Sequence, residues 1–178
     1  MSDKKEQLAR ATIMTNTRRQ VTIRLNKEYM NFSAAHFTIF SASQRERVHG
    51  HNFRVDAEIT TDVGEDGLCI DYRILKKILL EICNELDEYF LIPEHSPHLK
   101  ITSDDSYYRI TFNNQEIVQL ISDTKLLPLT NITVEELSFY ILGQLSARLS
   151  TTPCDISHLK IGVSSGGGQW GYSLSAMM

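Results

Sequence analysis

The chain has 178 residues, enough for one ordinary domain with a buried core, and 42% of them are hydrophobic. The net charge of −4 at pH 7 and the lack of a basic stripe argue against a nucleic-acid partner. The sequence contains no run of about 18 apolar residues, the length that a membrane-spanning helix needs.

The N-terminus and the cysteines indicate the cellular compartment of the protein. Residues 1–19 carry mixed charge and lack the apolar stretch of a secretory signal, so we expect a flexible lead-in. Cys69, Cys83 and Cys154 are odd in number and widely spaced, which fits neither a disulfide framework nor a CxxC metal motif. We therefore expect a cytoplasmic protein with a single domain over residues 20–178.

The first half of that domain has the pattern of strands. Residues 21–37 are moderately strand-like and end near His36, and a polar stretch follows at 41–47. In residues 51–63 apolar and polar side chains alternate, which predicts a half-buried strand. Its apolar positions are Phe53, Val55, Ala57 and Ile59. The sequence VGEDG at 63–67 then provides a turn.

The period changes in residues 71–90, where apolar residues recur every three or four positions and predict one face of a helix. That face comprises Ile74, Leu75, Ile78, Leu79, Ile82 and Leu86. Asp71 stands before it as a plausible N-cap. The next section, 95–131, contains the strand-like runs HLKIT, YYRITF and EIVQLI, which predict a short β excursion.

A second helix is predicted from Thr133, with an apolar face made by Val134, Leu137, Ile141 and Leu145. Thr133 and Glu136 have the spacing of a capping box. Two further strands, 158–165 and 169–177, flank a glycine-rich turn. The order β-β-α, insertion, α-β-β predicts an α+β domain with an antiparallel sheet.

Three histidines are candidate metal ligands. His49 and His51 alternate along a strand and therefore point to the same side, and His36 joins them if its strand lies alongside. Three neutral imidazoles with one open position form the usual catalytic Zn²⁺ site. The open position takes water or a substrate oxygen. An isolated H-x-H without any metal function is the alternative.

The remaining histidines are not expected to bind the metal, and the other fold known for an H-x-H strand does not fit the sequence. His95, His98 and His158 lie in loop or strand-entry positions, where we expect them to be solvated. Cupins also carry H-x-H, but with a glutamate a few residues later. Here Glu58 lies seven residues after His51 and helices follow, which argues against a cupin.

Several motifs together resemble the family of 6-pyruvoyltetrahydropterin and 6-carboxytetrahydropterin synthases. They are FSAAH at 32–36, HGHNF at 49–53, GLCIDYRILK at 67–76, Leu86–Asp87 and TVEEL at 133–137. The resemblance implies a tunnelling fold (T-fold), with a four-stranded antiparallel sheet and two helices on one face. It also implies a homo-oligomer, a trimer or hexamer, with active sites between neighbours.

The same resemblance implies a zinc site and a substrate. The three zinc ligands of the family transfer to His36, His49 and His51, and the substrate is a small-molecule pterin of the dihydroneopterin triphosphate type. Neither a nucleic acid nor a membrane is implied as a partner.

The sequence departs from this family at its usual catalytic cysteine, where Ser43, Gln44 and Arg45 stand instead. Glu46, however, creates E-x-x-H-G-H, which resembles a subgroup that cleaves the side chain to 6-hydroxymethyl-dihydropterin for folate synthesis. A carboxylate beside a metal can act as a base, so Glu46 is the expected catalytic residue. A surface glutamate without a role is the alternative.

Two other family positions differ. Asp87 and Glu88 replace an Asp-His pair, and a carboxylate could relay protons there only if its pKa were raised. The family's pterin-clamping glutamate falls in a region that here reads VSS, so Ser164 offers a weaker neutral contact. Glu135 is an alternative pterin-binding residue, although an acidic first helical turn is equally explained by the helix dipole.

We therefore expect a zinc-dependent carbon–oxygen or carbon–carbon lyase of this family, acting in queuosine or folate biosynthesis. A non-catalytic T-fold protein that binds a metal and a ligand is the alternative. The same chemistry on a purine-like, non-pterin substrate is a third possibility. The insertion at 95–131 could cover the site mouth, extend a barrel edge or contact another protein.

Overall fold

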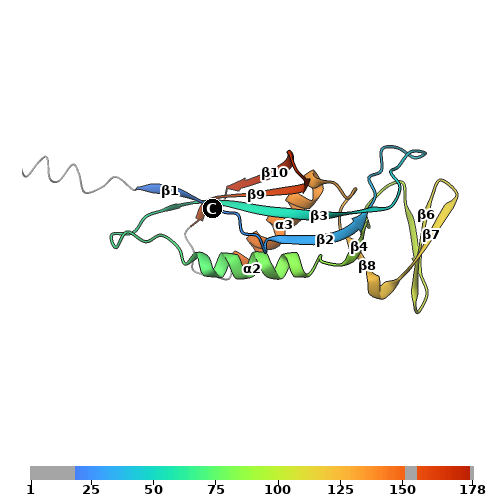
Figure 1. Ribbon diagram of the computed structural model, residues 1–178, viewed down its shortest axis with the longest axis horizontal. Helices are drawn as coiled ribbons and strands as arrows, with labels where there is room; N and C mark the ends of the chain where they lie inside the picture. Colours follow the sequence, from blue (N-terminus) through green and yellow to red (C-terminus); the bar gives the residue numbers. More distant parts are fainter. Residues whose placement is uncertain (1–18, 151–155, 177–178) are drawn as a thin grey trace, which may run out of the picture.

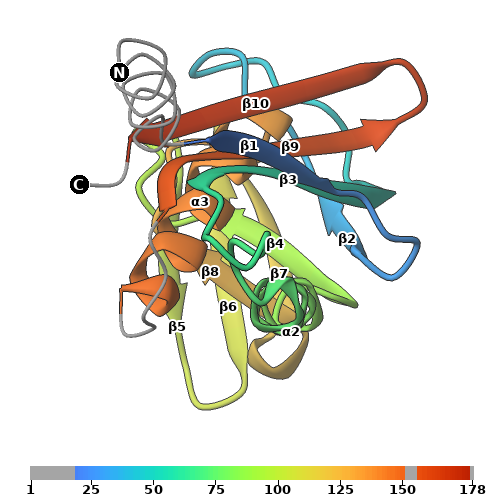
Figure 2. The ribbon, with the colours of Figure 1, turned by 90° about the vertical axis from the view of Figure 1, so that its left-hand side faces the viewer.

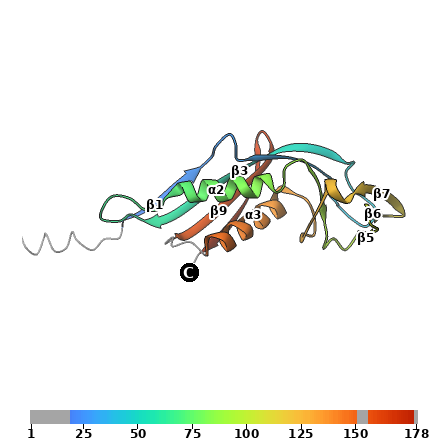
Figure 3. The same cartoon turned by 90° about the horizontal axis from the view of Figure 1, so that it is seen from below.

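A computed structural model describes residues 19–150 and 156–176. The expected lead-in, apart from Arg19, and Cys154 lie outside this part of the chain. A long sheet carries two helices on one face, and a smaller sheet lies at one end of the molecule (Figures 1, 2 and 3). The α+β class predicted from the sequence is confirmed.

The described residues form a main sheet, a small sheet and the helices. The main sheet contains β1 (Gln20–Leu25), β2 (Asn31–His36), β3 (His49–Asp62), β4 (Tyr89–Pro93), β8 (Thr124–Leu127), β9 (Ile156–Gly166) and β10 (Gln169–Ala176). The small sheet contains β5 (Lys100–Ser103), β6 (Tyr107–Phe112) and β7 (Gln115–Leu120). The helices are α2 (Tyr72–Asn84), the single turn η1 (Ile121–Asp123) and α3 (Val134–Leu149).

The main sheet has the order β10-β9-β3-β2-β4-β8, and β1 also pairs with β3. The expected single strand at 21–37 is instead two strands, because the chain turns at Lys27–Met30. β2 then pairs with the first half of β3 and β1 with its second half, both antiparallel. The antiparallel strands β1/β2, β3, β9 and β10 correspond to the expected four.

The remaining strands of this sheet were not predicted. β4 pairs in parallel with β2, and β8 pairs in parallel with β4, so the sheet is mixed. β4 is a short run with Phe90, Leu91 and Ile92 all buried. Such a run has no alternating pattern by which a strand is recognised.

The helices begin where the sequence indicates. The Asp71 carboxylate accepts a hydrogen bond from the Arg73 N–H (3.0 Å), and the Thr133 hydroxyl accepts one from the Glu136 N–H (3.3 Å). The Glu136 carboxylate accepts from the Thr130 N–H (3.2 Å) and not from Thr133, so only half of the capping box forms.

Ile74 does not belong to the buried face of α2, in contrast to the prediction, since it is 36% exposed. With 3.6 residues per turn, it lies about 100° from the centre of that face. The buried residues are Leu75, Ile78, Leu79, Ile82 and Cys83. They pack with α3 against the sheet to form the main core.

The predicted β excursion is confirmed as the meander β5-β6-β7. Asn113 and Asn114, which join β6 to β7, have φ values of 45° and 60°. Two consecutive positive φ angles characterise the type I′ hairpin turn, which favours asparagine. A second apolar cluster joins this small sheet to the main one, and contains Phe37, Ile39, Phe90, Ile92, Ile110 and Phe112.

Gly171 in β10 brings α3 close to the sheet. A Cβ at this position would lie 2.8 Å from the Val134 carbonyl carbon and 3.0 Å from the Glu135 nitrogen. Only glycine therefore lets the first turn of α3 approach β10 as it does. Over the described residues, neither helix is long and apolar enough to cross a membrane.

Candidate metal centre and its pocket

The pairing of β2 with β3 brings three imidazoles together. His36 lies directly opposite His49, and Ala34 lies opposite His51. Opposite residues of an antiparallel pair share a face, so all three histidines project to the same side. Their candidate ligand atoms lie within 4.8 Å of one another. The convergence expected from the sequence is therefore present.

Backbone carbonyls determine which nitrogens face the centre. His36 Nδ1 lies 3.0 Å from the Ile132 carbonyl oxygen, and His49 Nδ1 lies 2.8 Å from that of Arg47. A carbonyl can only accept, so each neutral ring carries its hydrogen on Nδ1 and presents a lone pair at Nε2. The buried Nε2 of His36 has no hydrogen-bond partner among the described residues. Such an orphaned acceptor fits a metal ligand.

The spacing of the nitrogens also fits a metal ion. His49 Nε2 and His51 Nε2 are 3.1 Å apart. Two nitrogens bound to a tetrahedral zinc at 2.0–2.1 Å lie about 3.3 Å from each other. Three imidazoles form a donor set that suits zinc, copper, iron or nickel. The residues present thus fit a transition-metal site with one open position.

His36 is held in the neutral state that binds a metal. Burial, which disfavours the charged form, and the charges of His49 and His51 together lower its pKa to about 4, although the Ile132 carbonyl opposes the shift. At neutral pH the ring therefore needs to lose no proton before coordination.

The histidines line a pocket of about 390 Å³, a volume suited to a small molecule. Other residues of its wall come from the loop after β2, the start of α3 and the β9–β10 turn. The polar and aromatic ones used below are Glu46, Glu135, Ser165, Gln169 and Trp170.

Glu46 lies beside the histidines, as its spacing from them suggests. Its Oε2 is 3.9 Å from His49 Nε2 and accepts a hydrogen bond from the Thr38 N–H at 3.1 Å. Burial acts to raise the pKa of this carboxyl, but the Thr38 hydrogen bonds and the neighbouring His49 and His36 outweigh it and lower the pKa. Glu46 is therefore ionised at neutral pH and able to accept a proton.

Glu135 also lies in the pocket wall. It follows the N-cap of α3, and the close approach of Gly171 to this turn holds it next to the sheet. A carboxylate in the first turn is stabilised by the helix dipole as well, so its position alone does not require a ligand.

Ser164 does not line this pocket, whereas its neighbour Ser165 does. Ser164 is buried opposite Arg54, and its hydroxyl hydrogen-bonds to Gly166. Successive strand residues point to opposite faces, and Val163 faces the core, so Ser165 shares that side. The alternation starting from Val163 would have identified Ser165. Gln169 Nε2 donates to the Ser165 hydroxyl at 3.0 Å.

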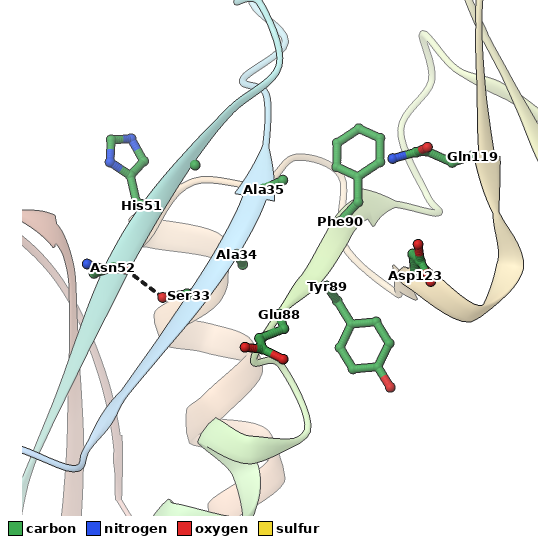
Figure 4. A pocket seen from close by; sticks show the side chains of 11 residues that line it. Ser33, Ala34, Ala35, His51, Asn52, Glu88, Tyr89, Phe90, Gln119 and Asp123 are labelled. Carbon is green, nitrogen blue, oxygen red and sulfur yellow. Dashed lines mark hydrogen bonds between the residues drawn. The ribbon is translucent and has the colours of Figure 1, made fainter.

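Asp87 and Glu88 are not brought to the histidines within one chain. The Asp87 carboxylate accepts from the Ser33 N–H (2.6 Å), and the Glu88 N–H donates to the Ser33 carbonyl (2.7 Å). Glu88 lines a different hollow of about 450 Å³, which Ser33, Asn52 and the strand at His51 also border. Asn52 and His51 are consecutive in β3 and point to opposite faces; in Figure 4 the His51 ring is directed away from Glu88.

The described cysteines take no part in the pocket. Burial, together with the charge of Asp87, raises the pKa of the Cys83 thiol to about 12. Cys83 and Cys69 are free thiols, and neither lines the pocket wall. Glu46, whose Oε2 lies 3.9 Å from His49 Nε2, is therefore the candidate base.

Comparison with known proteins gives a consistent set of matches. A family model described as 6-pyruvoyl tetrahydropterin synthase matches residues 24–165. A Methanocaldococcus jannaschii protein, provisionally named a 6-carboxy-5,6,7,8-tetrahydropterin synthase, is 29% identical over 142 residues. This match covers 79% of the present chain and 86% of that protein.

Two solved structures are similar over most of their length. The Plasmodium vivax 6-pyruvoyl tetrahydropterin synthase matches with a TM-score of 0.82 and 27% identity, over 89% of this chain and 99% of that one. The Plasmodium falciparum enzyme matches with a TM-score of 0.81 and 29% identity, over the same 89% and 99%. Two further P. vivax structures carry alanine or cysteine in place of a glutamate described as a catalytic residue.

Proposed function

This chain belongs to the 6-pyruvoyl tetrahydropterin synthase family, and we propose that it is a zinc-dependent lyase acting on dihydroneopterin triphosphate or a related pterin. The observation that carries the proposal is the convergence of the three histidine side chains in the wall of a pocket that Glu46 also lines. The family relationship supports a pterin as the substrate.

His36, His49 and His51 would hold the metal. A divalent cation held there would polarise substrate oxygens and so acidify the carbon-bound protons beside them. The Ile132 and Arg47 carbonyls keep two of these rings in the tautomer that coordination needs.

Glu46 is proposed as the general base. It is ionised, it lies near His49, and two hydrogen bonds to Thr38 keep it in place. From this position it would take a proton from the side chain of the pterin. The description of a glutamate as catalytic in the P. vivax protein supports the assignment.

The pterin ring is proposed to bind between Glu135 and the Ser165–Gln169 pair. Two N–H groups of the ring edge can bond to one carboxylate, which makes Glu135 the selective contact. Ser165, rather than Ser164, supplies the neutral contact, and its hydrogen bond from Gln169 leaves its own O–H free to donate.

Asp87 and Glu88 are proposed to assist the site of a neighbouring subunit in a trimer or hexamer. Glu88 lines a hollow with Ser33 and Asn52, on the face of β2 turned away from the histidines of its own chain, and Asp87 is hydrogen-bonded to the Ser33 N–H next to it. Glu88 has a φ of 63°, a left-handed conformation that is unfavourable for glutamate and is concentrated at functional sites. The free thiols of Cys69 and Cys83 support a cytoplasmic setting.

The proposal is tested by metal analysis and turnover together. We expect one zinc per chain, lost when both His49 and His51 are changed to alanine. We also expect dihydroneopterin triphosphate to be converted by the wild-type protein and not by Glu46→Gln, which retains the metal. Loss of triphosphate gives a 6-pyruvoyl product, whereas carbon–carbon cleavage gives 6-hydroxymethyl-dihydropterin and a place in folate synthesis.

A second candidate is a non-catalytic protein that binds a metal and a ligand. Ser164 falls in the region where the family has its pterin-clamping glutamate, and Glu88 replaces the histidine of the family's Asp-His pair. Both differences favour this candidate. Bound zinc with no turnover of any dihydropterin tested would support this candidate and overturn the lyase.

A further inference from the structure

The side chain of Arg45 lies between two phenylalanine rings from different parts of the fold. Its Cζ is 4.8 Å from the centre of the Phe37 ring and 5.6 Å from that of Phe112. Both distances are within the range of a cation–π contact. Phe37 directly follows β2, whereas Phe112 ends β6 in the insertion. Arg45 therefore connects the insertion to the metal-site loop.

The polar atoms of Arg45 have few hydrogen-bond partners, so the contact of its guanidinium with the two rings is what holds the side chain in place. Nη1 donates to the Glu46 carbonyl oxygen at 2.7 Å, but the buried Nε has no hydrogen-bond partner among the described residues. An unpaired buried N–H is unfavourable, so the arrangement depends on the flat guanidinium fitting between the rings. A lysine has no planar group that could replace it.

The loop that carries Arg45 is a tight hairpin. Ile39 pairs with Arg45, the Phe40 N–H donates to the Gln44 carbonyl at 2.9 Å, and the Glu46 N–H donates to the Thr38 carbonyl at 2.8 Å. Arg45 joins the aromatic rings behind the hairpin, while Glu46 lines the metal pocket in front. A shift of the Arg45 side chain would thus be transmitted to Glu46 through one peptide unit.

The insertion supplies the rear support of this hairpin. Phe112 and Ile110 of β6 belong to the same buried cluster as Phe37 and Ile39. Figure 1 shows the small sheet at the end of the molecule to which the β2–β3 loop extends.

We propose that the insertion positions Glu46 in the metal pocket, and that it does so through Arg45, clamped between Phe37 and Phe112. Arg45 is a positioning residue, since it touches neither the metal ligands nor the pocket. The inference rests on the proposed role of Glu46 as the base. It assigns the insertion a task within its own subunit instead of the covering of the site mouth or contact with another protein.

The experiment compares Arg45→Met and Phe112→Leu with wild type in two measurements. The first is amide hydrogen exchange of the peptide covering residues 38–48, followed by mass spectrometry on the zinc-loaded protein. We expect exchange to be at least about tenfold faster in both variants, because the hairpin loses its rear support. A peptide from α2 should exchange as in wild type, which shows that the fold is intact.

The second measurement is turnover of dihydroneopterin triphosphate. We expect kcat to fall by about tenfold to a hundredfold from misplacement of the base, while KM and zinc content stay unchanged. Phe112→Tyr, which keeps an aromatic ring, should have the exchange rate and the kcat of the wild-type protein. Tyr107→Leu is the matched control, because it also removes an aromatic ring from β6, but Tyr107 is 42% exposed. This variant should change neither the exchange rate nor kcat.

The results separate the two proposals. If wild-type protein does not convert the pterin, the proposed function fails, but the exchange data still decide whether the insertion orders the hairpin. If wild type is active and Arg45→Met and Phe112→Leu keep its kcat and its exchange rates, the positioning inference is overturned and the function stands. Equal loss of zinc and activity in the variants would also overturn it.

Discussion

Gly171→Ala tests how closely the start of α3 must approach the sheet. A methyl group at this position would lie 2.8 Å from the Val134 carbonyl carbon, 2.9 Å from its oxygen and 3.0 Å from the Glu135 nitrogen. All three atoms belong to the backbone, so no side-chain rotation can relieve the contact. Either β10 or the first turn of α3 must move.

The size of the effect follows from these contacts. Overpacking of a close-packed region costs about 1–3 kcal/mol, and we expect the free energy of unfolding to fall by about 2 kcal/mol. For a domain of this length, that corresponds to a fall in Tm of roughly 4 to 8 °C. The first turn of α3 carries Glu135 and β10 carries Gln169, so a shift of either element should also raise KM for the pterin. Zinc content should remain stoichiometric, since the three histidines lie on β2 and β3.

Gly143→Ala provides the matched control, because a Cβ there meets no atom within 4 Å and Gly143 lies within α3. Replacing an exposed helical glycine by alanine should stabilise the protein by about 1 kcal/mol. Urea unfolding and steady-state kinetics of both variants give the answer. A Gly171→Ala protein as stable as wild type, with an unchanged KM, would show that the reasoning about this close approach is wrong.

Three other predictions concern single side chains. In the metal-free protein, His36 has a pKa of about 4 against its usual 6.5, so the unfolded chain takes up the proton first and stability should decrease as pH falls through this interval. The loss should reach about 3 kcal/mol in urea titrations and be absent from His36→Gln; equal pH dependence of the two proteins would contradict it. Thr133→Ala removes the N-cap of α3 and should lower the unfolding free energy by about 1 kcal/mol; an unchanged urea midpoint would count against the cap. The Cys83 thiol, with its pKa raised to about 12 by burial, should react with alkylating reagents only when the protein unfolds, and labelling as fast as that of Cys69 would disprove this.

Local patterns in the sequence were sufficient for much of the fold. Alternation in β3, the caps at Asp71 and Thr133, and the Asn113–Asn114 turn each depend on residues that are neighbours along the chain. Their conformations are governed by backbone sterics and nearby hydrogen bonds, which the amino-acid order largely specifies. The parallel strands β4 and β8 were missed because their stability comes from pairing across the fold.

The candidate site, like the fold, could be predicted from the sequence only in part. That His49 and His51 share a face, and that Glu46 precedes them closely, follows from the sequence and the period of a strand. That Asp87 and Glu88 are hydrogen-bonded to the Ser33 backbone depends on how the α2–β4 connection packs against β2. The sequence spacing of Asp87 and Glu88 contains no information on this packing.

The amino-acid order alone determined that three imidazoles and a carboxylate were available, and on which side of its strand each of the paired histidines would project. Only the tertiary structure decided that His36 lies opposite His49, that Ile132 orients the His36 ring, and that Phe112 reaches Arg45 from the insertion. The physical reason is that register, tautomer and long-range stacking are set by groups far apart in the chain, which meet only when the core closes around them.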